Sequence, residues 1–166
     1  MLNRKIRFAA LLCTGILAGH AVSMVLTVGP SVVALEADKF LELNRVAEPA
    51  FAGRVPFLFL AVIISIFTWL VRIRKKWQTR EFAFVILSLL CIFEDFYFAF
   101  EANVPLNDTM TSWKTVYDLP GNWQEIRLEW YNYMYIHAAL LILMFVMLLI
   151  AQYFAARAEN KKPAHL

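Results

Sequence analysis

The sequence predicts an all-α membrane protein, a bundle of four transmembrane helices with its N- and C-termini in the cytoplasm. Its composition is the first reason: 61% of the 166 residues are hydrophobic and 17% are charged, whereas soluble domains are about 45–50% apolar. The second is segment length, since a membrane-spanning helix needs about 20 mostly apolar residues. Four segments meet this need, at about 8–28, 55–71, 82–100 and 131–154.

The third observation is the position of the basic residues. Most of them fall before the first span, between the second and third, and after the fourth, in the clusters Arg4, Lys5, Arg7; Arg72, Arg74, Lys75, Lys76, Arg80; and Arg157, Lys161, Lys162. The positive-inside rule places such clusters in the cytoplasm, so segments 30–54 and 101–130 should face outward. Because topology accounts for the net charge of +3, we expect no nucleic-acid partner. Short loops and basic inner clusters favour a bacterial inner membrane.

The four spans form one domain over residues 1–155, and residues 156–166 are expected to be a disordered cytoplasmic tail. Gly29-Pro30 should end the first span, because proline disfavours helix continuation. Segment 35–51 has an amphipathic helical pattern and should lie on the outer interface or lead into the second span. Cys13 and Cys91 each fall inside a span, which is typical of core residues and not of a disulfide.

The third span carries carboxylates among aromatic residues, where an unpartnered negative charge is costly. Tyr97 and Glu101 lie three and seven residues after Glu94, so the three side chains share one helical face. Asp95 is turned away from that face by about 100°. Asp95 should either pair with a neighbouring helix or stay protonated. Arg54, at the mouth of the second span, is a basic partner for Glu101.

Counting residues from the outer ends of the spans puts His20, Glu94 and His137 at one level, roughly 10–14 Å below the outer surface. Imidazole and carboxylate ligands suit Zn, Fe or Cu, and two histidines at one depth suit haem. The same groups suit a proton relay. They also suit a pocket for a phenol or quinone, with His137 as base and Tyr97 or Tyr133 as donor. A purely structural hydrogen-bonded cluster is the remaining alternative.

The run Asn103-Val104-Pro105-Leu106-Asn107-Asp108 follows the third span. Pro105 should stop the helix, and Asn103 and Asn107 can cap its open end. With this run, the chain resembles the anthrone-oxygenase-like family of small four-helix membrane proteins. The resemblance extends to a glycine-containing first helix, to segment 44–51 and to segment 130–137.

The family includes proteins that convert anthrones to anthraquinones with molecular oxygen. By position, the resemblance implies that Asn44, Asn103, Pro105, Asn107 and His137 line an outward-side site. Two features depart from the family pattern: Glu94-Asp95 lies inside the third span, and His137 stands where relatives have arginine.

These observations lead to an expected function, an oxidoreductase or oxygenase for a hydrophobic aromatic or quinone-like molecule that enters from the bilayer. His137 and Glu94 are the expected catalytic residues. The expected substrate contacts are His20, Asn44, Tyr97, Glu101, Asn103, Asn107 and Tyr133. The sequence does not decide the cofactor. The three possibilities are no cofactor, a metal held by His20, Glu94 and His137, and haem. The alternatives are a non-enzymatic accessory subunit with a membrane-protein partner, a homo-oligomer, and a metal-binding or proton-relay protein.

Overall fold

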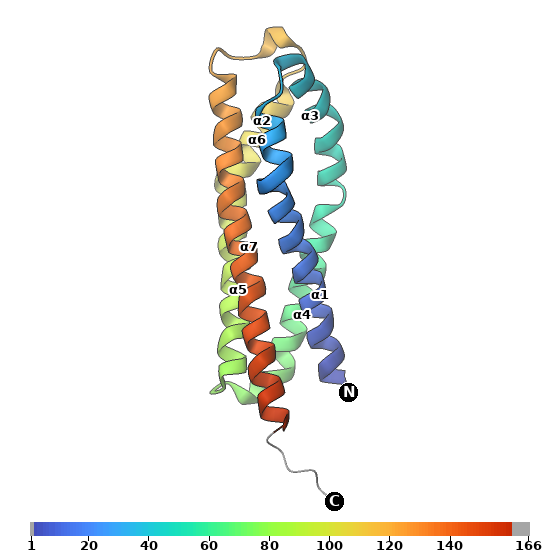
Figure 1. Ribbon diagram of the computed structural model, residues 1–166, viewed down its shortest axis with the longest axis vertical. Helices are drawn as coiled ribbons and strands as arrows, with labels where there is room; N and C mark the ends of the chain where they lie inside the picture. The colour runs from blue at the N-terminus through green and yellow to red at the C-terminus, as the bar shows by residue number, and fades with distance from the viewer. Residues whose placement is uncertain (1, 161–166) are drawn as a thin grey trace, which may run out of the picture.

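The computed structural model describes residues 2–160, apart from the side chains of residues 48 and 50–52. Four helical segments are long and apolar enough to cross a membrane: Leu2–Val33, Val55–Lys76, Arg80–Ser112 and Trp123–Asn160. They stand side by side as an elongated bundle (Figure 1). The predicted four-helix membrane bundle is therefore confirmed at the level of helix number, length and apolar character.

The long segments are built from shorter elements. The first comprises α1 (Leu2–Ser23), the π-helix η1 (Met24–Val28) and α2 (Gly29–Val33); the second comprises α4 (Val55–Ile73) and the short η2 (Arg74–Lys76). The third comprises α5 (Arg80–Phe98), the π-helix η3 (Ala99–Asn103) and α6 (Val104–Ser112), and the fourth is α7 (Trp123–Asn160). The connections outside these segments hold α3 (Ala37–Ala52) and η4 (Val116–Asp118).

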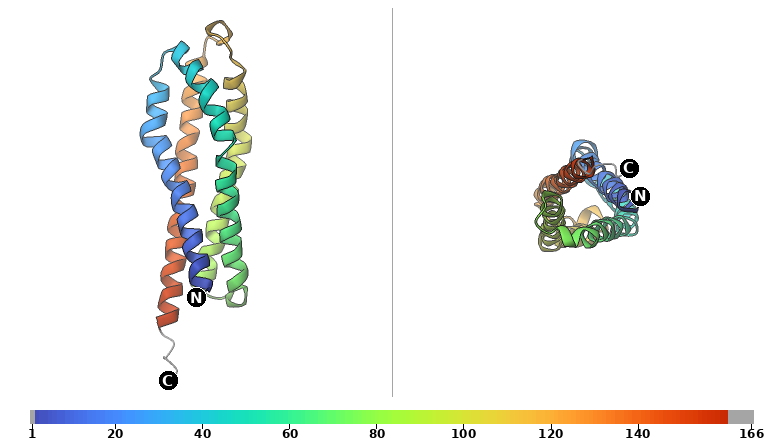
Figure 2. Two further views of the ribbon diagram at one scale, coloured as in Figure 1. Left: turned by 90° about the vertical axis from the view of Figure 1, so that its right-hand side faces the viewer. Right: turned by 90° about the horizontal axis from the view of Figure 1, so that it is seen from below.

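The helices form a closed ring in which α1 packs against α4 and α7, and α5 packs against α7 and α4 (Figure 2). The start of α1, the end of α7 and the η2 turn lie at one end of the bundle (Figure 1). We call this the basic end, because it holds Arg4, Arg7 and residues 74–76. We call the opposite end, where α2, α3, α6 and η4 lie, the loop end.

Two prolines that were expected to end helices do not. The first helix continues past Pro30 to Val33, and the third continues past Pro105 to Ser112. A proline inside an α-helix lacks an N–H donor and clashes with the carbonyl four residues earlier. Here a wider π-helical turn precedes each proline. Its closing hydrogen bond runs from Gly29 N–H to the Met24 carbonyl in one case, and from Val104 N–H to the Ala99 carbonyl in the other.

The fourth helix is also longer than its predicted span. α7 begins at Trp123, about two turns before the expected start, and continues to Asn160. Residues 156–160 are therefore helical, contrary to the expected disordered tail, and residues 161–166 lie outside the described residues. Tyr131, at the expected start of this span, contacts the first helix. Its hydroxyl donates to the Val25 carbonyl at 2.9 Å, and its ring lies so close to Gly29 that a Cβ there would be 2.1 Å away.

Buried apolar side chains from all four helices form one core along the bundle axis. A second cluster at the loop end packs α3 against α6, with Phe40 and Trp113 among its buried members. Phe40 also stacks on Trp123 at the start of α7, with ring centroids 5.9 Å apart. α3, the amphipathic helix expected from the sequence, thus packs its apolar side onto the loop end and leads into α4.

An ionic cluster closes the core at the basic end. Arg7 on α1 has a side chain that is only 5% exposed, and it forms ion pairs with Glu81 on α5 and Glu159 on α7. The indole N–H of Trp69 on α4 donates to Glu81 at 3.1 Å. One arginine, two carboxylates and one indole therefore join all four helices at this level.

We expect Arg7→Ala to lower the free energy of unfolding by about 2–3 kcal/mol, because it removes the buried guanidinium that joins two carboxylates and leaves Glu81 with only the half-exposed Lys76 as charge partner. The measurement is unfolding in mixed detergent micelles, followed by tryptophan fluorescence. The matched control is Arg4→Ala, whose side chain also pairs with Glu159 but is 73% exposed, and which should cost less than about 1 kcal/mol. Equal, small losses for both variants would contradict the structural role of Arg7.

Candidate functional site

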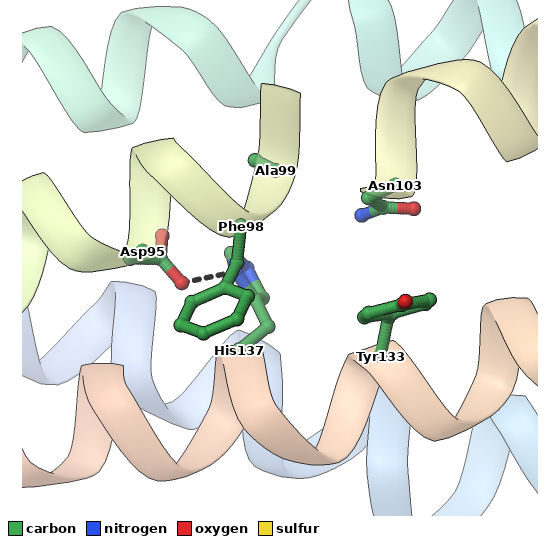
Figure 3. Close-up of a pocket in the computed structure, with 6 residues that line it drawn as sticks. All are labelled: Asp95, Phe98, Ala99, Asn103, Tyr133 and His137. Atoms are coloured by element: carbon green, nitrogen blue, oxygen red, sulfur yellow. Dashed lines mark ion pairs between the residues drawn. The ribbon is translucent and has the colours of Figure 1, made fainter. Parts of the chain in front are cut away.

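Asp95 on α5 and His137 on α7 point toward each other across the seam between the two helices (Figure 3). The distance from His137 Nδ1 to Asp95 Oδ1 is 2.6 Å, and the two side chains are 22% and 1% exposed. A carboxylate buried at membrane depth requires a partner, and His137 supplies it. Nδ1 is the imidazole nitrogen that faces Asp95, so Nε2 lies on the other side of the ring.

The periodicity of α5 places Asp95 inside the bundle. Glu81, Val85, Ser88, Ile92 and Asp95 are all buried and are spaced four, three, four and three residues apart, which keeps them on one helical face. On α7, Met134, Ala138 and Leu141 are buried on either side of the half-buried His137. The tightly packed α5–α7 seam therefore holds both members of the pair in place.

Asp95 and His137 form part of the wall of a small cavity between α5 and α7. Its lining residues are Asp95, Phe98, Ala99, Asn103, Tyr133 and His137 (Figure 3). The volume of the cavity, counted as the space that the centre of a water molecule can occupy, is about 10 Å³. This is room for about one water molecule. The site as it stands therefore admits one small polar group and not a whole aromatic ring.

Hydrogen-bond acceptors without partners line this cavity. Both carboxylate oxygens of Asp95 and the amide oxygen of Asn103 are buried and have no hydrogen bond from the described residues. The contact of Asp95 with His137 is close enough for an ion pair, but its geometry is not that of a hydrogen bond. Buried acceptors are costly unless a donor reaches them. The cavity is thus chemically suited to an O–H, N–H or acidic C–H group.

Aromatic rings and a second histidine surround the pair. Phe59 on α4 lies 6.0 Å from the His137 ring and 5.4 Å from Phe96, measured between ring centroids. His20 on α1 is half-buried and close enough to His137 for two imidazolium charges to repel each other. The site therefore combines an apolar wall that includes Phe59 of α4 with one carboxylate from α5 and two imidazoles, one each from α1 and α7.

The structure separates the predicted site residues into two groups. His137, Tyr133 and Asn103 line the cavity, and His20 lies near His137. Glu94, Tyr97 and Glu101 share a face, as expected, but that face is exposed on the outside of the bundle. The structure therefore places Glu94, which was predicted as a catalytic residue, outside the bundle and away from His137, because the preceding turns of α5 place Asp95 inward in its stead.

The remaining predicted residues lie elsewhere. Asn44 is on α3 and Asn107 on α6; both are half-buried, and neither lines the cavity. Arg54 and Glu101 are both exposed and form no ion pair with each other. Within residues 2–160, no three His, Cys, Asp or Glu side chains gather as a metal site would require. The expected ligand set of His20, Glu94 and His137 is thus not assembled.

Asp95 was expected to pair with a neighbouring helix or to stay protonated, but it was not among the residues predicted for the site, although it is the residue closest to His137. A signal for it was present, because Asp95 lies in register with Ser88 and Glu81, the other polar residues at seven-residue intervals along α5. Polar residues that repeat on one face of an otherwise apolar membrane helix mark the side that faces the protein interior. Glu94 lies instead in register with Leu87 and Leu90, which are exposed.

Comparison with known proteins adds no relative: no family model, no curated protein and no solved structure matches the chain.

Proposed function

We propose that this protein is a membrane oxidoreductase of the oxygenase type, in which the Asp95–His137 pair removes a proton from a hydrophobic phenol-like or anthrone-like molecule. The observation that carries the proposal is the buried carboxylate 2.6 Å from an imidazole beside unpartnered acceptors. A carboxylate this close to a histidine stabilises the imidazolium that forms when the neutral ring takes a proton, which makes the histidine a better general base. The resemblance to the anthrone-oxygenase-like family supports the choice of substrate class.

The cavity limits how such a molecule can bind. Since it holds only one small group, the reacting hydroxyl or C–H enters it while the ring system stays outside the cavity, on the surface of the bundle. Phe98 lines the cavity and is partly exposed, so it offers an aromatic surface to that ring. Asn103 and Tyr133 then lie next to the substrate oxygen and position it.

The proposed reaction balances with molecular oxygen as the oxidant. His137 Nε2 takes a proton from the benzylic carbon, and Asp95 stabilises the imidazolium. The carbanion adds oxygen and recovers the proton as a hydroperoxide, which loses water to leave a carbonyl. Overall, one CH₂ group and one O₂ give one C=O group and one water.

We further propose that the protein lies in a bacterial inner membrane with its basic end in the cytoplasm. The clusters of arginine and lysine at that end support this orientation. Asp95 is 15 residues from the start of α5, or about 22 Å at the α-helical rise. The site would then lie in the outer half of a hydrocarbon layer about 30 Å thick, within reach of lipid-soluble molecules.

The test is oxygen consumption by the purified protein in lipid nanodiscs with a hydroxylated anthrone as probe. We expect His137→Gln and Asp95→Asn each to lower kcat by about 10²-fold or more, which is the usual contribution of a general base. The control is Glu125→Gln, which changes an exposed carboxyl in the first turn of α7 and should keep the wild-type rate. Equal rates for the wild type and His137→Gln would refute the assignment.

A second candidate function, proton transfer, is favoured by a specific observation, the proximity of His20 to His137 beside a water-sized cavity. Two imidazoles, one carboxylate and one water can pass a proton along the seam. In proteoliposomes with a pH-sensitive dye inside and an imposed membrane potential, His20→Leu should then slow the proton flux severalfold. Flux that matches that of protein-free liposomes would exclude this function.

A further inference from the structure

Glu94, the neighbour of Asp95 on α5, points outward, which is unfavourable for a carboxylate of a single bundle in a membrane. Glu94 is exposed on the outside of the bundle and is 14 residues from the start of α5. At 1.5 Å per residue this is about 21 Å from the basic end, in a hydrocarbon layer about 30 Å thick. The carboxylate thus lies about 9 Å below the far boundary, on a surface that lipid would cover.

Glu94 makes no hydrogen bond or ion pair with any described residue. A charged or even a protonated carboxyl that faces lipid without a partner is unfavourable by several kcal/mol. Membrane helices therefore keep such groups at helix contacts. Asp95 follows this rule inside the bundle, and Glu94 does not.

The exposed face around Glu94 has a regular pattern. Leu87, Leu90, Glu94 and Tyr97 are all exposed and repeat at intervals of three and four residues, so they form one stripe along α5. Tyr97 is 60% exposed and carries a hydroxyl donor one turn from the Glu94 acceptor. The stripe therefore offers a donor and an acceptor within the same membrane level.

We propose that this stripe is the contact between two copies of the chain, related by a two-fold axis that runs along the bundle. In such a pair the two α5 helices lie parallel, and Tyr97 of one copy donates to Glu94 of the other. Helical side chains lean toward the N-terminus of their helix, so the long Tyr97 side chain points back to the level of Glu94. The contact satisfies both carboxyls by symmetry.

A second copy fits this surface better than an unrelated helix. A foreign partner would need only a donor for Glu94, whereas the stripe supplies both an acceptor and a donor and is complementary to itself, as a two-fold interface requires. The contact uses the outer face of α5, and the Asp95–His137 site uses its inner face. The proposal therefore goes beyond the proposed function and does not depend on it.

Cysteine cross-linking in native membranes tests the proposal. In a background with Cys13→Ala and Cys91→Ala, Leu87→Cys should give an oxidant-induced disulfide dimer, because Leu87 lies on the stripe near the axis. The matched control is Leu143→Cys on α7, since both leucines are 44% exposed but only Leu87 belongs to the stripe. Leu143→Cys should give no dimer above background.

Glu94→Leu and Tyr97→Phe, each added to Leu87→Cys, should lower the cross-linked fraction by about threefold or more, because each removes the interhelical hydrogen bond. Both changes leave a side chain that is stable in lipid, and size-exclusion chromatography checks that the bundle remains folded. The proposal is overturned if Leu87→Cys cross-links no better than Leu143→Cys. It is equally overturned if Leu87→Cys forms an adduct with a different protein and no dimer.

Discussion

The contact between the carboxylate of Asp95 and the imidazole of His137 is the interaction on which the arrangement of the cavity depends. It crosses the α5–α7 seam at 2.6 Å, where two of the helices pack along much of their length. A carboxylate with 1% exposure is shielded from bulk water, so the imidazole opposite is the main group that can stabilise its charge. The same contact turns Nδ1 of the imidazole toward Asp95 and leaves Nε2 on the other side of the ring, which is the arrangement that the proposed reaction needs.

α5 is anchored in this way at two levels on the same face. Glu81 pairs with Arg7 of α1 at the basic end, and Asp95 pairs with His137 of α7 two heptads further along. Between them the face is apolar except for Ser88, whose hydroxyl bonds its own helix at the Val85 carbonyl. Two charged contacts separated by an apolar stretch fix both the rotation of α5 and its height, because a shift by one residue would break both at once.

The number of helices, their approximate positions and the histidine level could be read from the sequence, because apolar length and charge clusters depend on local composition. The choice between Glu94 and Asp95 could not be made from spacing to Tyr97 and Glu101 alone. That spacing shows which residues share a face, and only the contact with α7 decides which face points inward. The register with Ser88 and Glu81 was the better guide, since it follows the buried side along the whole helix.

The prolines show a second limit of local reasoning. Pro30 and Pro105 each break the α-helical hydrogen-bond pattern, and the sequence therefore predicted an end to the helix. The structure keeps both helices intact with a π-helical turn just before each proline. Such turns are common near functional sites, and here η3 contributes Ala99 and Asn103 to the cavity. Packing against α7 stabilises an arrangement that propensity alone disfavours.

A double-mutant cycle on Asp95 and His137 tests the central claim most directly. The free energies of unfolding of Asp95→Asn, His137→Gln and the double variant are compared with that of the wild type in the same detergent mixture. The account predicts a coupling energy of about 1–3 kcal/mol, as found for residues in one buried charged contact. Additive losses, with a coupling energy near zero, would show that the two side chains do not stabilise each other and would contradict the account.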